Sequence, residues 1–139
     1  MQVREFMTKD IQLVDPETLL KDAALKMREA DTGFLPVGEN DRLIGTITDR
    51  DIAIRAIADG KDPCKAKVRD AMTDELYYCY EDQPAEEAAA IMSEHQIRRL
   101  PILNRQKRLV GVVSLGDLSK WGTDALVGHT IEEISQTRH

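Results

Sequence analysis

Two ten-residue stretches decide the fold that the sequence predicts: LIGTITDRDI at residues 43–52 and LVGVVSLGDL at residues 109–118. In each stretch, an apolar run typical of a β-strand leads to a hydroxyl residue, two further residues, an aspartate and the apolar spacing of a helix. The hydroxyl and acidic pairs are Thr48 with Asp51 and Ser114 with Asp117. A hydroxyl at the N-cap and a carboxylate at the third helical position suit a capping box, so each stretch predicts a strand that runs directly into a helix.

The two stretches belong to a longer internal repeat. Val3–Thr8 matches Val68–Thr73 at an offset of 65 residues, whereas Gly45 matches Gly111 at an offset of 66. The difference indicates one inserted residue in the second copy, most simply in the turn around residues 104–106. Because missing a repeat gives the wrong fold, the duplicated unit is the first constraint on the architecture.

Each copy predicts the element order β-α-β-β-α. The expected strands are 11–14, 34–37 and 43–47 in the first copy and 76–80, 100–103 and 108–113 in the second. The expected helices cover residues around 19–27 and 52–57, and then 85–94 and 115–121. The predicted fold class is therefore α/β, of the α+β kind, with two pseudo-twofold-related repeats that bury their apolar faces in one disk. The predicted domains are repeat 1 at residues 1–60, repeat 2 at residues 61–121 and a C-terminal tail at residues 122–139.

The composition favours a globular protein of the reducing cytoplasm. Hydrophobic residues make up 42% of the 139 positions, which suits a packed core. The net charge of -6 disfavours nucleic acids and anionic membranes as partners, since both need a cationic face. Cys64 and Cys79 are too few for a disulfide framework, and neither a signal peptide nor a membrane span is expected. No metal site is expected either, because cysteine and histidine lack metal-binding spacing.

The repeat resembles the tandem CBS (cystathionine-β-synthase) domain pair, or Bateman module. The resemblance rests on LPV at 35–37 and LPI at 100–102, each followed by the glycine, hydroxyl and aspartate pattern, and it covers residues 1–121. Thr48-Asp49-Arg50-Asp51 is similar to the signature of small stand-alone stress- or hypoxia-response CBS proteins. The resemblance implies a homodimer formed by helix packing and clefts between the repeats that bind an adenosyl ligand. AMP, ADP or ATP is the expected ligand, with S-adenosylmethionine and NAD as second choices.

Four residues at the two strand ends are the candidates for ribose binding. Thr48 and Asp51, like Ser114 and Asp117, are interpreted first as helix caps. The cap and the ribose interpretations are compatible, because a carboxylate oxygen outside the cap is free to bind a diol, as in dinucleotide folds. The sequence leaves open whether either aspartate has this second role.

Further candidates are arginines for phosphate and apolar residues for adenine. Arg98 and Arg99 precede a strand, where alternation turns one of two consecutive side chains inward, and a guanidinium there suits phosphate. The alternative is that both arginine side chains lie on the surface and are solvated. Arg50 is a weaker phosphate candidate that equally suits a pair with a nearby carboxylate. Val37 and Ile102 are candidates for the walls around adenine, with an ordinary core position as the alternative.

Enzyme activity is not expected, and no catalytic residue is assigned. The sequence contains no nucleophile elbow, P-loop lysine or zincin motif. The preferred interpretation is a regulatory module that senses adenosine nucleotides, for energy sensing or stress response, and acts in trans on an unidentified protein through its dimer. The alternative is a structural or protein-interaction CBS dimer without ligand. A nucleotide hydrolase is the least favoured.

Overall fold

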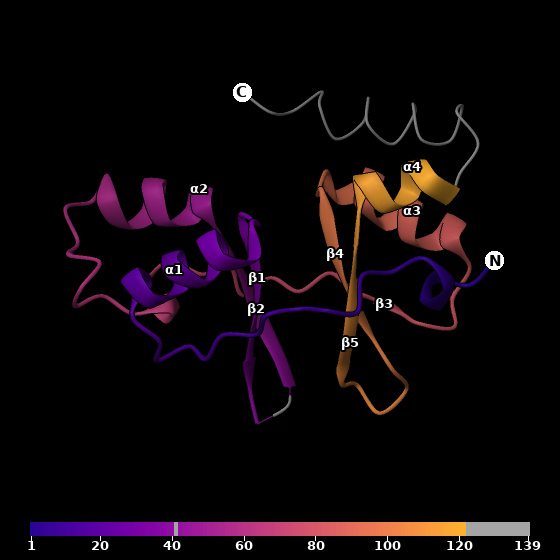
Figure 1. Ribbon diagram of the computed structural model, residues 1–139, viewed down its shortest axis with the longest axis horizontal. Helices are drawn as coiled ribbons and strands as arrows, with labels where there is room; N and C mark the ends of the chain where they lie inside the picture. The colour runs from indigo at the N-terminus through magenta and orange to yellow at the C-terminus, as the bar shows by residue number, and fades with distance from the viewer. Residues whose placement is uncertain (41, 122–139) are drawn as a thin grey trace. The chain divides into compact units, whose positions relative to one another are not determined.

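The protein divides into two compact units in the structure, a computed structural model that describes residues 1–40 and 42–121 (Figure 1). We call residues 12–76 the continuous unit, and residues 1–11 together with residues from 77 onward the split unit. The tail predicted at residues 122–139 lies outside the described residues. None of the helices in the described ranges is long and apolar enough to cross a membrane.

The continuous unit is built on one antiparallel strand pair. Its elements are α1 (Leu20–Ala30), β1 (Phe34–Glu39), β2 (Arg42–Thr48), α2 (Asp49–Asp51), the π-helix η2 (Ile52–Ile57) and the 3-10 helix η3 (Val68–Asp70). β1 pairs with β2, and Val14 adds an isolated parallel bridge to Val37. The helix face of α1 that carries Leu20, Ala23 and Met27 is buried, as the helical spacing of these residues predicts.

The split unit is built on a three-stranded sheet of order β3-β4-β5. Its elements are the 3-10 helix η1 (Val3–Glu5), β3 (Cys79–Tyr80), α3 (Ala85–His95), β4 (Arg99–Leu103), β5 (Leu109–Ser114) and α4 (Leu115–Trp121). β4 pairs in parallel with β3 and antiparallel with β5. Pro101 is compatible with this central strand because β3 pairs only with the residues after it, Ile102 and Leu103.

The predicted α+β class is confirmed, and the order of elements agrees with the prediction except at the first strand of each copy: residues 11–14 form no strand, and the strand predicted at 76–80 is shorter than expected. The stretch 11–14 contributes only the bridge of Val14, and the stretch 76–80 is a strand only at Cys79 and Tyr80. The apolar residues that suggested longer strands do not all face a core. Leu13 and Leu76 are 41% and 37% exposed, whereas Val14 and Cys79 are buried.

Each unit is completed by the segment near the start of the other predicted repeat. We call residues 3–8 and 68–73 the lead-in segments. Thr8 exchanges two backbone hydrogen bonds of 2.9 Å with Val112 in the split unit. Thr73 exchanges equivalent bonds of 2.8 and 2.9 Å with Thr46 in the continuous unit. The lead-in segments are thus exchanged, so each compact unit contains residues of both predicted repeats.

The exchanged segments explain the two glycines of the repeat. A Cβ atom at Gly45 would lie 2.5 Å from the Thr73 carbonyl oxygen. A Cβ atom at Gly111 would lie 2.6 Å from Met7 Sδ and 3.0 Å from the Thr8 carbonyl oxygen. The close approach that an interior strand glycine predicts is therefore made, at both positions, by a lead-in segment.

Candidate functional site

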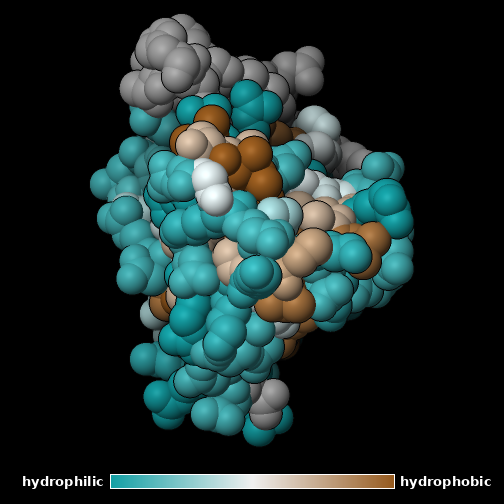
Figure 2. Space-filling model, turned by 90° about the vertical axis from the view of Figure 1, so that its left-hand side faces the viewer, coloured by the Kyte–Doolittle hydropathy of each residue, from teal (hydrophilic) through white to brown (hydrophobic). Residues whose placement is uncertain are grey.

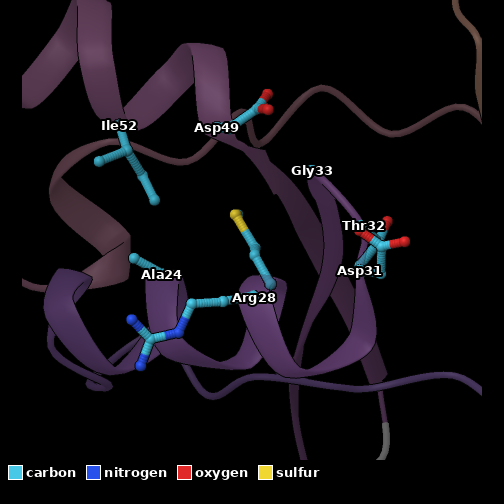
Figure 3. Close-up of a pocket in the computed structure, with 8 residues that line it drawn as sticks. Ala24, Arg28, Asp31, Thr32, Gly33, Asp49 and Ile52 are labelled. Carbon is cyan, nitrogen blue, oxygen red and sulfur yellow. The ribbon is translucent and has the colours of Figure 1, made fainter.

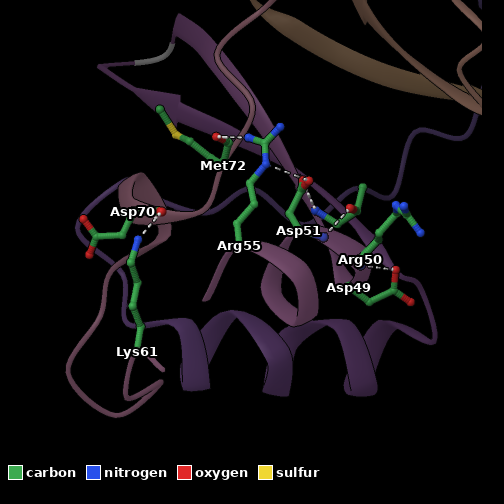
Figure 4. Close-up of polar contacts among 8 residues, drawn as sticks. Asp49, Arg50, Asp51, Arg55, Lys61, Asp70 and Met72 are labelled. Atoms are coloured by element: carbon green, nitrogen blue, oxygen red, sulfur yellow. Dashed lines mark hydrogen bonds and ion pairs between the residues drawn. The ribbon is translucent and has the colours of Figure 1, made fainter. Parts of the chain in front are cut away.

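The first candidate site is the corner where β2 ends and α2 begins. The Asp51 amide donates to Thr48 Oγ1 at 3.1 Å, and the Thr48 amide donates to Asp51 Oδ2 at 3.0 Å (Figure 4). The predicted capping box is therefore confirmed. Such a cap stabilises a helix start by about 1 kcal/mol, which accounts for both residues without a ligand.

The second corner repeats this geometry where β5 enters α4. The Asp117 amide donates to Ser114 Oγ at 3.1 Å, and the Ser114 amide donates to Asp117 Oδ2 at 2.9 Å, as predicted. Asp117 is only 9% exposed, and the Thr8 hydroxyl approaches the same Oδ2 atom at 3.4 Å. Thr8 was not predicted as a site residue, although its place at the end of a repeated lead-in segment was a usable signal.

The carboxylate of Asp51 has a different neighbour, Arg55. Arg55 Nε lies 3.9 Å from Asp51 Oδ1, the oxygen that the cap does not use. The Arg55 side chain also donates from Nη1 to the Met72 carbonyl at 3.1 Å. Arg55 was not predicted as a site residue, although its position four residues after Asp51 on a helix permits this pair.

The structure separates the two adjacent arginines predicted for phosphate. Arg99 begins β4 directly opposite Ser114, and its side chain is half-buried. Arg98 is exposed and lies before the strand, where its carbonyl accepts a hydrogen bond of 3.2 Å from the Leu115 amide. Within residues 1–40 and 42–121, Arg99 takes part in no ion pair, so its charge is not neutralised by a neighbouring carboxylate. Both residues thus lie near the second corner, but only Arg99 pairs with a corner residue, Ser114, and only Arg99 is half-buried.

The other predicted site residues are not brought to the corners. Arg50 is exposed, and Figure 4 shows its guanidinium directed away from the Asp51 carboxylate. Val37 and Ile102 are fully buried in the cores of the two units. Strand alternation places Ile102 with Leu100 on the core side of β4 and leaves Arg99 on the opposite side. These positions fit the core alternative and do not support a role for Val37 and Ile102 as adenine walls.

A separate open depression of about 400 Å³ lies beside the first corner (Figure 3). Its lining comes from α1, from the turn that follows it and from the helical side of the corner; the residues are Ala24, Met27, Arg28, Asp31, Thr32, Gly33, Asp49 and Ile52. Neither Thr48 nor Asp51 lines it. Arg28, Asp31 and Asp49 point away from one another in the close-up, so the depression presents no convergent set of polar groups (Figure 3).

Metal and thiol chemistry find little support in the described part of the chain. No group of three or more histidine, cysteine, aspartate or glutamate side chains in residues 1–40 and 42–121 is placed to hold a metal ion. Burial raises the pKa of the Cys79 thiol to about 11, so this thiol remains protonated at neutral pH. The chemistry that the corners offer is hydrogen bonding by a carboxylate.

Comparison with known proteins identifies the family. The sequence model of the CBS domain matches residues 3–57 and 68–124, which contain both corners. The chain therefore belongs to the CBS domain family and carries a pair of these domains, as the sequence predicted.

Its relatives include two bacterial proteins of similar length. The chain is 37% identical over 138 residues to the uncharacterized protein YlbB of Bacillus subtilis, covering 97% of this chain and 92% of YlbB. It is 39% identical over 118 residues to hypoxic response protein 1 of Mycobacterium tuberculosis, covering 84% of this chain and 82% of that protein. The stress-response relatives that the signature at residues 48–51 suggested are thus present in the family.

Solved structures of the family show the same fold. Hypoxic response protein I, crystallised with two coordinated zinc ions, matches with a TM-score of 0.80 and 36% identity over 88% of this chain and 100% of its own. The CBS domain pair of MJ0100, in complex with 5′-methylthioadenosine and S-adenosyl-L-methionine, matches with a TM-score of 0.77 and 26% identity over 86% of this chain and 94% of its own. Adenosine-type ligands therefore occur on this fold.

Proposed function

We propose that this protein is a non-enzymatic regulatory module that binds an adenine nucleotide at one or both corners. In each corner one carboxylate oxygen, Oδ2, serves the helix cap, and the cap leaves Oδ1 as an acceptor for a ribose diol. The observation that carries the proposal is that, at both Asp51 and Asp117, the cap uses only one of the two carboxylate oxygens. The adenosyl ligands of MJ0100 support the same class of ligand for this chain.

A phosphate-bearing ligand suits the second corner better than an uncharged adenosine. Arg99, which carries a permanently charged guanidinium, pairs with Ser114 across the sheet, and a guanidinium matches the geometry of a phosphate. AMP, ADP or ATP is therefore the preferred ligand, with S-adenosylmethionine and NAD as second choices. Ligand binding would act through the difference in affinity between two states of a homodimer or of a complex with a separate protein target.

Isothermal titration calorimetry tests this function. We expect AMP or ATP to bind the folded protein with a dissociation constant in the micromolar range, and the double variant Asp51→Asn/Asp117→Asn to lose this binding. Asparagine keeps the side-chain oxygen that accepts the cap hydrogen bond, so circular dichroism should show an unchanged fold. A folded wild-type protein that gives no heat with AMP, ATP or S-adenosylmethionine at millimolar concentration would contradict the proposal.

The exposed apolar side chains of η2 support the homodimer, and also the alternative function of a ligand-free interaction module. Ile54 and Ile57 are 54% and 53% exposed, and the side of the molecule that carries η2 shows apolar atoms among a mostly hydrophilic surface (Figure 2). Exposed apolar side chains that gather in one contiguous patch are typical of association sites. Sedimentation equilibrium should show a dimer that Ile54→Lys/Ile57→Lys weakens. The alternative predicts the same dimer without any nucleotide response.

A further inference from the structure

We propose that Arg55 is a positioning residue that orients the carboxylate of Asp51 for ribose binding at the first corner. This inference rests on the proposed function, because it assigns a role to a residue that touches the ribose-binding group and not the ribose itself.

Two contacts fix the Arg55 guanidinium beside the corner (Figure 4). Nη1 donates to the Met72 carbonyl at 3.1 Å, and Nε lies 3.9 Å from Asp51 Oδ1. The first is a hydrogen bond, whereas the second is longer than one, so Oδ1 keeps its capacity to accept a proton from a hydroxyl. The guanidinium thus attracts Oδ1 without occupying it.

The carboxylate of Asp51 is therefore held from two sides. Oδ2 accepts from the Thr48 amide at 3.0 Å, and Oδ1 faces Arg55. A carboxylate fixed in this way loses little rotational freedom when it binds a diol, and such preorganisation strengthens binding. Removing Arg55 would leave the cap bond in place and release Oδ1, and it would also remove the hydrogen bond to the Met72 carbonyl.

Arg55 also connects the corner to a lead-in segment. Met72 precedes Thr73, whose backbone exchanges two hydrogen bonds with Thr46 on β2. A second cationic side chain contacts the same segment: Lys61 Nζ donates a hydrogen bond to the Asp70 carbonyl at 3.2 Å. Among the described ion pairs and hydrogen bonds, Lys61 has none with Asp51, so it provides a matched control: the same charge and the same kind of backbone contact, without the carboxylate.

The second corner is built differently. The position equivalent to Arg55, at an offset of 66, is Trp121, which carries no charge. The neighbour of Asp117 is instead the hydroxyl of Thr8. The role of Arg55 should therefore be confined to the first corner, and the Asp117→Asn background isolates it.

The test compares two ligands by calorimetry in the Asp117→Asn protein. AMP carries the ribose diol, and 2′,3′-dideoxy-AMP lacks it while keeping adenine and phosphate. We expect Arg55→Gln to weaken AMP binding by about fivefold and to change 2′,3′-dideoxy-AMP binding by less than about twofold, because it acts through Asp51. Arg55→Lys should recover part of the loss, and Lys61→Gln should change neither dissociation constant by more than about twofold.

Other outcomes would overturn the proposal. If Arg55→Gln lowered the affinity for both ligands equally, Arg55 would be only structural or would contact the phosphate. Adenosine would separate these two cases because it lacks the phosphate. An Asp117→Asn protein that binds no AMP, when the wild type does, would show that the first corner is not a ribose site, and would leave the proposed function to the second corner. A wild-type protein that binds no AMP would remove the proposed function itself. Urea unfolding of each variant establishes that binding is measured on folded protein.

Discussion

Arg99 lies directly opposite Ser114 in the antiparallel ladder of β4 and β5, and in the continuous unit Phe34 holds the equivalent place opposite Thr48. Residues paired in this way have Cβ atoms about 4.5–5.5 Å apart, so their side chains share one face of the sheet. The second corner thus combines a carboxylate, a hydroxyl and a guanidinium, whereas the first has an aromatic ring in place of the guanidinium. The two corners are chemically unequal toward a phosphate.

This inequality predicts that Arg99, and not Arg98, contributes to phosphate binding. Arg99→Gln should weaken AMP binding by roughly tenfold, the size expected for one charge-assisted hydrogen bond, and should leave adenosine binding nearly unchanged. Arg98→Gln is the matched control, because it removes the same charge from the exposed neighbouring position. Calorimetry with AMP and adenosine measures both effects in the Asp51→Asn background, which leaves the second corner intact. Equal losses for the two variants would point to general electrostatics.

The glycines of the repeat predict unequal costs for the same substitution. Gly45→Ala would place its Cβ 2.5 Å from a backbone oxygen, that of Thr73, which is fixed by two hydrogen bonds to Thr46. Gly111→Ala meets the Met7 Sδ atom first, at 2.6 Å, and a methionine side chain adapts easily. Each substitution overpacks its own unit and should lower the free energy of unfolding by about 1–3 kcal/mol. Gly45→Ala should lie at the upper end of this range.

Urea denaturation gives the free energy of unfolding of both variants. If Gly111→Ala proved as destabilising as Gly45→Ala, the Thr8 carbonyl at 3.0 Å would be the controlling contact instead of Met7. If neither variant lost stability, the lead-in segments would not be packed against the strands as described.

The two cysteines should differ in reactivity and in their effect on pH dependence. Cys64 is exposed, whereas burial raises the pKa of Cys79 from 9.0 to about 11. A thiol-disulfide reagent at pH 8 should therefore modify Cys64 rapidly and Cys79 only on unfolding. Because the folded pKa is the higher one, Cys79 contributes stability that is complete below pH 9 and is lost as pH rises toward 11.

Denaturation of the wild type and of Cys79→Ala at several pH values measures this contribution. The wild-type protein should lose more stability than the variant between pH 9 and pH 11, since lysines and tyrosines that titrate there are common to both. Parallel curves for the two proteins would contradict the raised pKa.

The sequence predicted those features that depend on neighbouring residues. The capping boxes followed from a three-residue spacing, and the order of elements followed from periodicity within one repeat. Strand ends were less predictable, because Leu13 and Leu76 are apolar yet exposed. Val37 illustrates a related limit, since an apolar residue in a strand suits a core and a ligand wall equally until its face is known.

Features that depend on residues distant in the chain were not predicted. Thr8 reaches Asp117 across 109 positions because the lead-in segments are exchanged between the units. Arg55 finds the Met72 carbonyl for the same reason. The repeat identified residues 3–8 and 68–73 as equivalent, but periodicity alone gives no information on which unit each segment joins.

The central claim is that Asp51 or Asp117 binds a ribose, and a crystal structure of the protein grown with AMP tests it most directly. We predict that the ribose hydroxyls of AMP lie within hydrogen-bonding distance, about 2.5–3.0 Å, of a carboxylate oxygen of Asp51 or Asp117. AMP bound elsewhere, with both carboxylates engaged only in their helix caps, would contradict the claim.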